Sequence, residues 1–421
     1  MNRILRVSTI ITVAGAPVCA QVGITAIGTP PGGSSIAYGV SADGQVVVGY
    51  HTTVIDPGPP IITQNEAIRW TLANGRVGLG DLAGGTFESR ALGVNSDGSV
   101  VVGFSNSSNG PEAFRWTSAG GMVGLGDLAG GPFNSSAAAC SSNGNTVVGY
   151  GFSTNGVEAF MWTTTTPMTG MGDLPGGIFS STANAISADG SVIVGTSISG
   201  NGNEAFRWTQ GSGMVGLSDL PGGVFNSSAN GVNADGTVIV GSSISANGPE
   251  AYRWTQATGM VGLGDLPGGS FSSGATAVSA DGRVIVGTGN SAAGGRAFIW
   301  DAVAGMRDLG AYLASLGVNM TGWELDAATG VSADGTVIVG YGVAPGFTQT
   351  GWVAVVPPPT CYANCDASTS PPILNANDFQ CFLNKYAASD PYANCDNSTN
   401  PPILNANDFQ CFLNAYAAGC T

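Results

Sequence analysis

The chain has 421 residues, of which only 9% are charged, and its formal net charge is −15. A balance this acidic excludes nucleic acid and anionic membrane surfaces as partners, because both are recognised through basic patches. The length suits one large domain with a smaller one attached.

Residues 1–20 have the three parts of a secretory signal peptide. MNRILR supplies a basic start, VSTIITVAGA an apolar stretch, and Val18 and Ala20 the small residues that flank a cleavage site. An N-terminal strand is the alternative. No later apolar stretch is long enough to span a membrane. The sequence therefore predicts a secreted, extracellular protein without a membrane span.

Six of the eight cysteines lie close to the C-terminus, at Cys361, Cys365, Cys381, Cys395, Cys411 and Cys420. An even set in a short segment of an exported chain indicates disulfides. Of the other two, Cys19 leaves with the signal peptide. Cys140 replaces a strand valine, which predicts a buried thiol that acts as a small apolar residue, with a reactive or pairing role as the alternative.

Tryptophans recur with a strict period, at Trp70, Trp116, Trp162, Trp208, Trp254 and Trp300, each 46 residues after the last. We expect a seventh equivalent at Trp352, which follows after 52 residues. A period of this size is typical of a repeat architecture.

Each repeat contains four short strand candidates. Around Trp254 they are GVNAD, ending in the Asp235-Gly236 hairpin turn, then TVIVGSS, EAYRWT and MVGLGDL. The β-branched run TVIVGSS predicts a strand buried on both faces. Four strands in a repeat of this length match one blade of a β-propeller. A parallel β-helix is the alternative, but its coils are shorter.

The number of turns predicts the number of blades. Asp-Gly or Asn-Gly turns begin at residues 43, 97, 143, 189, 235, 281 and 334. At the N-terminus, ITAIGTPPGG (24–33) aligns with MVGLGDLPGG, the last strand of a repeat. The chain would therefore enter on a fourth strand and leave on a third, so that its two ends complete one blade and remove the exposed sheet edges. We expect a mainly β fold, with a seven-bladed β-propeller over residues 21–356.

EAFRW, GLGDLPGG and GVSADG resemble the HAF-repeat extracellular proteins over residues 24–356, and GWELDAATGVSADGTVIVGYG (322–342) resembles the end of such an array. The family takes its name from a His-Ala-Phe tripeptide. Here the position of the histidine holds Glu or Arg, so chemistry that depends on that histidine would be absent. The resemblance implies an architecture more than an activity.

The polar residues of the repeat favour a structural role. Catalysis needs a unique constellation of groups, whereas equivalent carboxylates and guanidinium groups recur at Glu66, Glu112, Glu158, Glu204, Glu250, Asp81, Asp127, Asp173, Asp219, Asp265, Arg69, Arg115, Arg207 and Arg253. An Arg–Asp pair that ties strands together is one such role. The only histidine, His51, has no motif around it. Glu88, Glu324 and Asp326 are the carboxylates that do not repeat.

The connection between repeats reads GG-x-F-x-S and contains an aromatic series at Phe87, Phe133, Phe179, Phe225 and Phe271. Rings beside Ser and Asn on a rim could stack on sugar rings, and several equivalent weak sites suit a polysaccharide. The alternative is that each ring packs against the neighbouring blade.

The sequence changes character after Val356. PPPT (357–360) is a short Pro-rich linker, and residues 361–421 contain two near-identical units, each ending in a helical pattern such as Phe379, Phe382, Leu383 and Tyr386. Calcium takes six to eight oxygen ligands from alternating loop positions. The loop before each helix offers such a set, like half of an EF-hand, and predicts two Ca²⁺ sites at Asn364, Asp366, Ser368, Asn375 and Asp378, and at Asn394, Asp396, Ser398, Asn405 and Asp408.

Two copies of loop plus helix resemble a cysteine-rich dockerin-like domain. The loops depart from the dockerin pattern: they are longer and each holds only two carboxylates, which should weaken calcium binding. A disulfide-held helical hairpin, in which the Asx residues cap helices, is the alternative. The repeat favours one disulfide in each unit, Cys365–Cys381 and Cys395–Cys411, with Cys361–Cys420 joining the ends, although six cysteines allow 15 pairings.

The dockerin resemblance implies that the tail binds a cohesin-like module on a scaffold or cell surface, with contacts near Asn377, Phe379, Asn407 and Phe409. We therefore expect a secreted, non-catalytic binding or display protein, anchored by a calcium-dependent tail. The alternative is a polysaccharide-active enzyme docked by the same tail, which would require non-repeating carboxylates to converge at one mouth of the ring.

Overall fold

The computed structural model describes residues 22–58, 61–347, 349–357 and 376–388, together with Ala393, Phe409, Phe412 and Leu413. These residues form 28 strands and two helices. The predicted signal peptide, most of the linker and most of the tail lie outside the described residues.

The strands form four-stranded antiparallel groups, which we number along the chain. The first three groups are β2 (Ser34–Val40), β3 (Val47–Asp56), β4 (Ile62–Thr71) and β5 (Gly75–Gly78); β6 (Gly84–Val94), β7 (Val100–Ser107), β8 (Gly110–Thr117) and β9 (Gly121–Gly124); and β10 (Gly130–Cys140), β11 (Thr146–Ser153), β12 (Gly156–Thr163) and β13 (Thr169–Gly170). The next three are β14 (Gly176–Ile186), β15 (Ile193–Ser199), β16 (Gly202–Thr209) and β17 (Gly213–Gly216); β18 (Gly222–Val232), β19 (Val238–Ser245), β20 (Gly248–Thr255) and β21 (Gly259–Gly262); and β22 (Gly268–Val278), β23 (Ile285–Ser291), β24 (Gly294–Asp301) and β25 (Gly305–Asp308). The last group is β26 (Glu324–Val331), β27 (Val337–Val343), β28 (Thr350–Val355) and β1 (Gly23–Ala26). One parallel bridge, Val157 to Ser180, joins the third and fourth groups into a single sheet.

Local chemistry explains the hairpins. In the fifth group the Asp235 carboxylate accepts a hydrogen bond from the Thr237 backbone N–H at 3.0 Å, and Gly236 has φ 73°, which favours glycine. The glycine inside the buried run has a different reason. A Cβ on Gly241 would lie 1.9 Å from the carbonyl oxygen of Ser228, so only glycine lets the first two strands approach.

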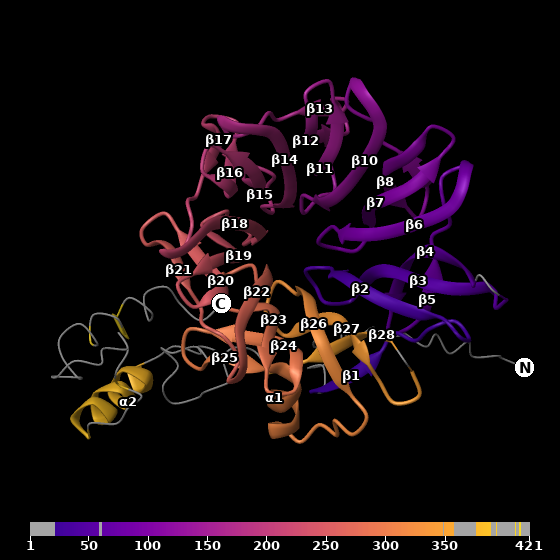
Figure 1. The fold of residues 1–421 in the computed structure, drawn as a ribbon. Helices are drawn as coiled ribbons and strands as arrows, with labels where there is room; N and C mark the ends of the chain where they lie inside the picture. The colour runs from indigo at the N-terminus through magenta and orange to yellow at the C-terminus, as the bar shows by residue number, and fades with distance from the viewer. Residues whose placement is uncertain are drawn as a thin grey trace, which may run out of the picture.

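The groups are arranged around a common centre as a β-propeller (Figure 1), and the first strand of each group contacts the first strand of the next. The turns between first and second strands are joined by backbone hydrogen bonds of 2.9–3.2 Å. In each bond one N–H donates to a carbonyl of the next group, in the order Ala42, Ser96, Ser142, Ala188, Ala234, Ala280, Ala333 and back to Ala42. The series of bonds is therefore a closed circle.

The two ends of the described propeller meet in one sheet. β1 pairs with β28 in antiparallel register, with Ile24 opposite Ala354, and the Ile27 N–H donates to the Gly351 carbonyl at 2.9 Å. The N-terminal strand is thus the fourth strand of the last group, as the alignment of residues 24–33 predicts.

Trp352 does not belong to the predicted tryptophan series. The other six tryptophans pair with a β-branched residue on the second strand, as Trp254 does with Ile239. Trp352 instead pairs with Gly340 and is fully buried. In the other groups the residue opposite this glycine is the Ile, Phe or Tyr that lies two residues before the Trp. The expected equivalence is wrong because pairing with β27, and not the spacing along the chain, sets the register.

The hydrophobic core lies between neighbouring groups, so that both faces of each sheet are covered. Between the first and second groups it contains Val46, Val48, Ala67, Ala91, Val101 and Phe114. Cys140, predicted to be buried, is a free and partly buried cysteine that packs against the corresponding cluster between the second and third groups. Burial raises the pKa of its thiol to about 12, although Arg115 nearby acts in the opposite direction.

Two helices complete the described chain. α1 (Leu309–Ser315) follows the sixth group, and its Leu309 and Leu313 are buried against the last. α2 (Ala376–Ala387) belongs to the tail, where Phe382 stacks on Phe412 with ring centroids 4.1 Å apart. Within the described ranges, neither helix is long and apolar enough to cross a membrane.

Native protein should therefore leave Cys140 unmodified by iodoacetamide at pH 8. With a pKa of about 12, only about one thiol in ten thousand is thiolate at that pH. Peptide mapping by mass spectrometry should find the label on Cys140 only after unfolding in urea. Cys140→Val, which restores the residue of other groups, should change stability by less than about 1.5 kcal/mol. Rapid labelling of the native thiol would contradict this prediction.

Candidate functional site

The repeated glutamates are bound within the scaffold. In five groups a glutamate carboxylate on the third strand accepts a hydrogen bond of 2.9–3.1 Å from a backbone N–H just after the fourth strand. The five glutamates are Glu66, Glu112, Glu158, Glu204 and Glu250. A Cβ on Gly124 would lie 2.2 Å from Glu112 Oε1, so a larger residue at position 124 would displace the carboxylate. These carboxylates serve as structural acceptors.

Serine and arginine side chains connect successive groups. Ser135 Oγ accepts from the Ala113 N–H at 3.0 Å and donates to the Gly126 carbonyl at 2.6 Å, across the boundary between the second and third groups. Arg115 Nε donates to the Gly144 carbonyl at 3.0 Å, and Arg69 bonds its neighbouring turn in the same way. In these two groups the arginine binds a carbonyl, and not the aspartate that the sequence suggests.

A double-mutant cycle tests the glutamate bond. Glu112→Ala removes the acceptor of a backbone N–H and should cost about 1–2 kcal/mol. Gly124→Ala should cost a similar amount by displacing the carboxylate. In the Glu112→Ala background the second change should cost little, which gives a measurable coupling. The shift in urea midpoint is the readout, and Glu112→Gln, which keeps an acceptor oxygen, is the control. Additive losses would contradict the arrangement.

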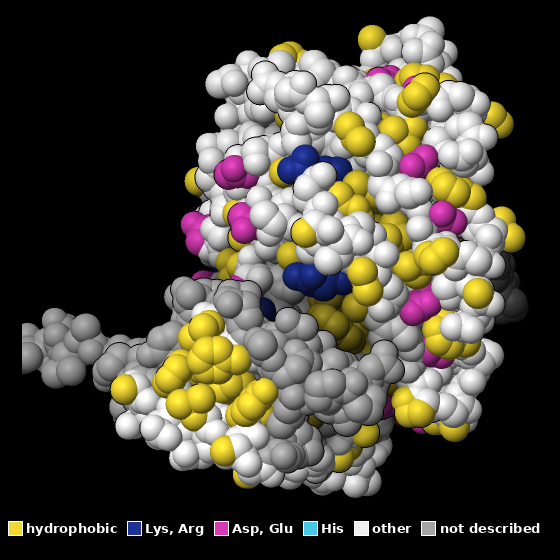
Figure 2. Space-filling view, turned by 90° about the vertical axis from the view of Figure 1, so that its left-hand side faces the viewer, with side chains coloured by type: hydrophobic (Ala, Val, Ile, Leu, Met, Phe, Trp, Pro, Cys, Tyr) yellow, Lys and Arg dark blue, Asp and Glu magenta, His cyan; other side chains and the backbone are white. Residues whose placement is uncertain are grey.

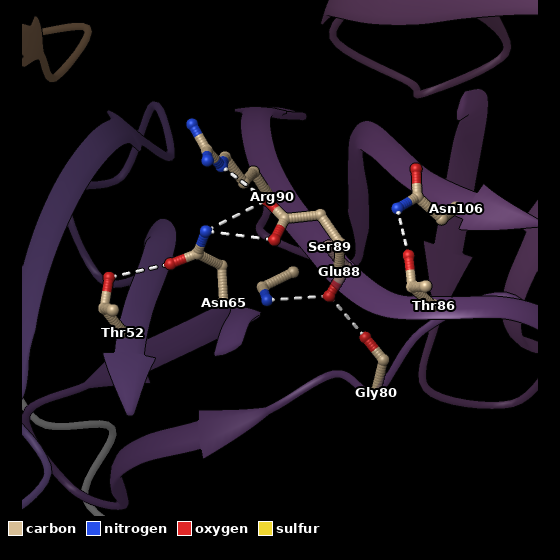
Figure 3. Close-up of polar contacts among 9 residues, drawn as sticks. Thr52, Asn65, Gly80, Thr86, Glu88, Ser89, Arg90 and Asn106 are labelled. Atoms are coloured by element: carbon tan, nitrogen blue, oxygen red, sulfur yellow. Dashed lines mark hydrogen bonds and ion pairs between the residues drawn. The ribbon is translucent and has the colours of Figure 1, made fainter. Parts of the chain in front are cut away.

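The three non-repeating carboxylates form two separate clusters (Figure 3 shows the first). Glu88 accepts from Arg90 Nε at 2.9 Å and from Asn65 Nδ2 at 3.0 and 3.1 Å. Glu324 lies 3.9 Å from Arg296. Burial raises the pKa of Asp326, and its neighbours there are the same Arg296 and Glu324. Each cluster is thus built around its own arginine.

An aromatic–arginine cluster lies beside Glu88, and we define it as Tyr38, Tyr50, Glu88, Arg90, Phe104 and Tyr341. Arg90 lies over two rings, 4.7 Å from the centroid of Tyr50 and 5.7 Å from that of Phe104. Tyr38 stacks on Tyr50 with centroids 5.8 Å apart. Cation–π contacts of this kind hold a guanidinium in place. The Arg90 side chain is still 34% exposed, so part of it remains accessible to solvent.

The cluster spans three groups. Burial raises the pKa of Tyr38, and Tyr50 and Tyr341 raise it further, while Arg90 opposes the shift. Tyr341 comes from the last group, Tyr38 and Tyr50 from the first, and Arg90 from the second. A surface assembled from the last, first and second groups exists only because the two ends of the described propeller meet.

His51 lies next to this cluster in sequence but is bound elsewhere. Its Nε2 lies 3.4 Å from the Glu66 carboxylate. Burial lowers the pKa of His51, and nearby Arg76 lowers it further, whereas Glu66 raises it. The histidine is therefore uncharged at neutral pH, and its carboxylate partner is one of the repeated structural glutamates.

The cluster follows from departures from the repeat. On the second strand, the position of Tyr50 is aromatic in four groups and a small hydroxyl residue in three: Tyr50, Phe104, Tyr150, Thr196, Ser242, Thr288 and Tyr341. The position of Arg90 holds arginine in the second group only. Sequence reasoning missed this site because it searched among the residues that repeat. The signal was present in the residues that do not.

The predicted aromatic rim lies at the start of the first strands, next to turns of the preceding group. A Cβ on Gly110 would lie 3.9 Å from Cδ1 of Phe133. The same arrangement, at 3.8 Å, recurs where Phe179, Phe225 and Phe271 face Gly156, Gly202 and Gly248. Phe87 is 38% exposed. The placement of the other rings favours the packing interpretation, and a sugar-binding rim stays a prediction.

Of the predicted calcium ligands only Asp378 lies within the described residues. It is fully buried in the first turn of α2, where the last ligand of a loop is expected. Within the described ranges no group of three or more His, Cys, Asp or Glu side chains could hold a metal. Cys381 on α2 is disulfide-bonded. The other predicted ligands and tail cysteines lie outside the described residues.

No family model and no curated protein matches the chain. Among solved structures, it is similar to the β-propeller domain of the Trilobed protease from Pyrococcus furiosus, at 10% identity and a TM-score of 0.48, over 76% of this chain and 93% of that one. An oligogalacturonate lyase from Vibrio parahaemolyticus gives 12% identity and a TM-score of 0.48, over 80% and 94% of the two chains. TolB from Acinetobacter baumannii gives 15% and 0.41, over 62% of each chain.

Proposed function

We propose that the protein is a secreted, non-catalytic binding protein. Its propeller, with seven blades, carries the ligand site at the aromatic–arginine cluster. Its dockerin-like tail binds two Ca²⁺ ions and attaches the molecule to a cohesin-like or other protein on a scaffold or cell surface. The observation that carries the binding role is the cluster itself, which combines partly exposed aromatic rings with fixed polar groups.

The chemistry of the cluster suits a neutral polysaccharide. The apolar faces of sugar rings pack on aromatic side chains, and the cluster contains four of them. Glu88 and Asn65, which hold each other in place, offer further lone pairs and N–H groups to hydroxyls. The carboxylate content of the aromatic–arginine cluster supports binding over hydrolysis there, because two-carboxylate hydrolysis needs a facing pair, whereas Glu88 is the one carboxylate in the cluster as defined and binds Arg90.

Contacts between the two tail units support the docking proposal. Phe382 and Phe412 hold the same place in the two repeats and stack on each other. Phe379 and Phe409, also equivalent, meet edge-on with centroids 5.8 Å apart. Such pairing of equivalent rings is expected when two similar helices pack around a pseudo-two-fold axis, as in a doublet.

Tyr50→Ala tests the cluster. Loss of one stacking ring should weaken binding of a soluble neutral polysaccharide by about tenfold, equivalent to about 1.4 kcal/mol, measured by affinity electrophoresis against a panel of such polymers. Tyr150→Ala, which changes the equivalent residue outside the cluster, is the matched control and should leave binding unchanged. Equal binding by both variants and the native protein, or no binding to any polymer, would refute the assignment.

Calcium-dependent capture tests the tail. Full-length protein, immobilised in oxidised form, should retain one partner from the envelope or secreted fraction of the producing cell when Ca²⁺ is present and release it in chelator. Asp366→Ala combined with Asp396→Ala should abolish capture and lower calcium binding in titration calorimetry, whereas Asp390→Ala, outside both loops, should not. Capture that is unchanged by chelator and by the Asp366→Ala/Asp396→Ala double variant would exclude the proposed anchor.

A further inference from the structure

Two equivalent grooves lie on the face of the propeller that carries the turns between first and second strands. The larger has a volume of about 470 Å³ and is lined by Arg207, Asp235, Arg253 and Trp254. The other, of about 410 Å³, lies one repeat earlier and shares Arg207 and Asp235 with the first. Figure 2 looks at the side that carries β16 and β20, where basic side chains lie singly among hydrophobic and uncharged ones.

The arginines of these grooves differ from their equivalents elsewhere. Arg69 and Arg115 each donate to a carbonyl of the next turn. Within the described residues, Arg207 and Arg253 have neither such a bond nor an ion pair. Burial lowers the pKa of Arg253, and no neighbouring carboxylate opposes it. A half-buried guanidinium without an acceptor on the protein keeps its N–H donors available to an anion.

Asp235 supplies an acceptor in the same grooves as the guanidinium groups. Its Oδ1 binds the Thr237 backbone N–H and hydroxyl, which lower the pKa of the carboxyl and keep it charged. It lines both grooves, as Arg207 does. The grooves therefore combine two cations and one acceptor from two adjacent repeats.

We propose that these grooves bind a linear polysaccharide of uronate residues. Each guanidinium takes one carboxylate through paired N–H bonds, and Asp235 accepts a hydroxyl from the sugar between them. A nucleic acid fits this pattern poorly, since strong binding to its phosphates needs many more cations than these grooves supply. The site is distinct from the aromatic–arginine cluster and does not depend on it.

The test uses the full chain and a mannuronate hexamer, with the neutral mannose hexamer of the same linkage as the comparison. Calorimetry should show binding of the acidic hexamer that weakens as salt rises, and at least tenfold weaker binding of the neutral one. Arg207→Gln and Arg253→Gln should each reduce affinity about tenfold, the effect of losing one charge-assisted contact. Arg207→Lys should fall in between, because it keeps the charge without the paired donors.

Arg115→Gln is the matched control, since the Arg115 side chain already binds a carbonyl, and it should leave affinity unchanged. Tyr50→Ala should also leave it unchanged, which separates this site from the aromatic–arginine cluster. Equal affinity of the Tyr50→Ala protein for the neutral and acidic hexamers, equal loss in Arg115→Gln, or no binding of the acidic hexamer would overturn the proposal. Thermal melting of each variant identifies any loss of affinity that comes from misfolding.

Discussion

The circle of hydrogen bonds at the turns is the constraint on which the structure depends. Each turn donates one N–H to the next group, and the last donor, Ala333, reaches the first, Ala42. An open array would leave a buried donor at one end, an acceptor at the other, and two exposed sheet edges. Pairing of β1 with β28 removes these edges in the same step. Closure of the ring thus provides hydrogen-bond partners both for the two ends of the described propeller and for the turns around its centre.

Closure also explains why the repeated polar residues are unavailable for chemistry. Ser135 satisfies backbone groups of the preceding group, and Glu112 satisfies the end of its own fourth strand. Such bonds are needed at every boundary, because a buried backbone group left unpaired costs about 1–3 kcal/mol. A polar residue that recurs in most groups therefore indicates a structural role in holding the propeller together. Binding surfaces arise where a repeat departs from the rule and its side chain is released from that role.

Much of the fold could be predicted from the sequence, and the site could not. The period, the Asp-Gly turns and the β-branched runs are local signals, and they located the strands and the N-terminal closing strand. Trp352 was misplaced because its register depends on Gly340, a partner that spacing alone does not identify. The cluster around Arg90 joins residues from the last, first and second groups. Contacts of that kind depend on which faces of separate repeats meet, and no single repeat contains that information.

The aromatic–arginine cluster has a structural role besides the binding role proposed for it. At the bulge of the first strand, polar side chains bridge to the next group from the fourth group onward: Asn184, Asn230, Thr276 and Thr329 each bond a carbonyl there. The first three groups have Tyr38, Leu92 and Ala138 instead. The boundary between the first two is joined by Asn65 with Glu88 and by Arg90 over Tyr50. The residues of the aromatic–arginine cluster thus also replace the bridge, so changing them should affect stability as well as any binding at the proposed site.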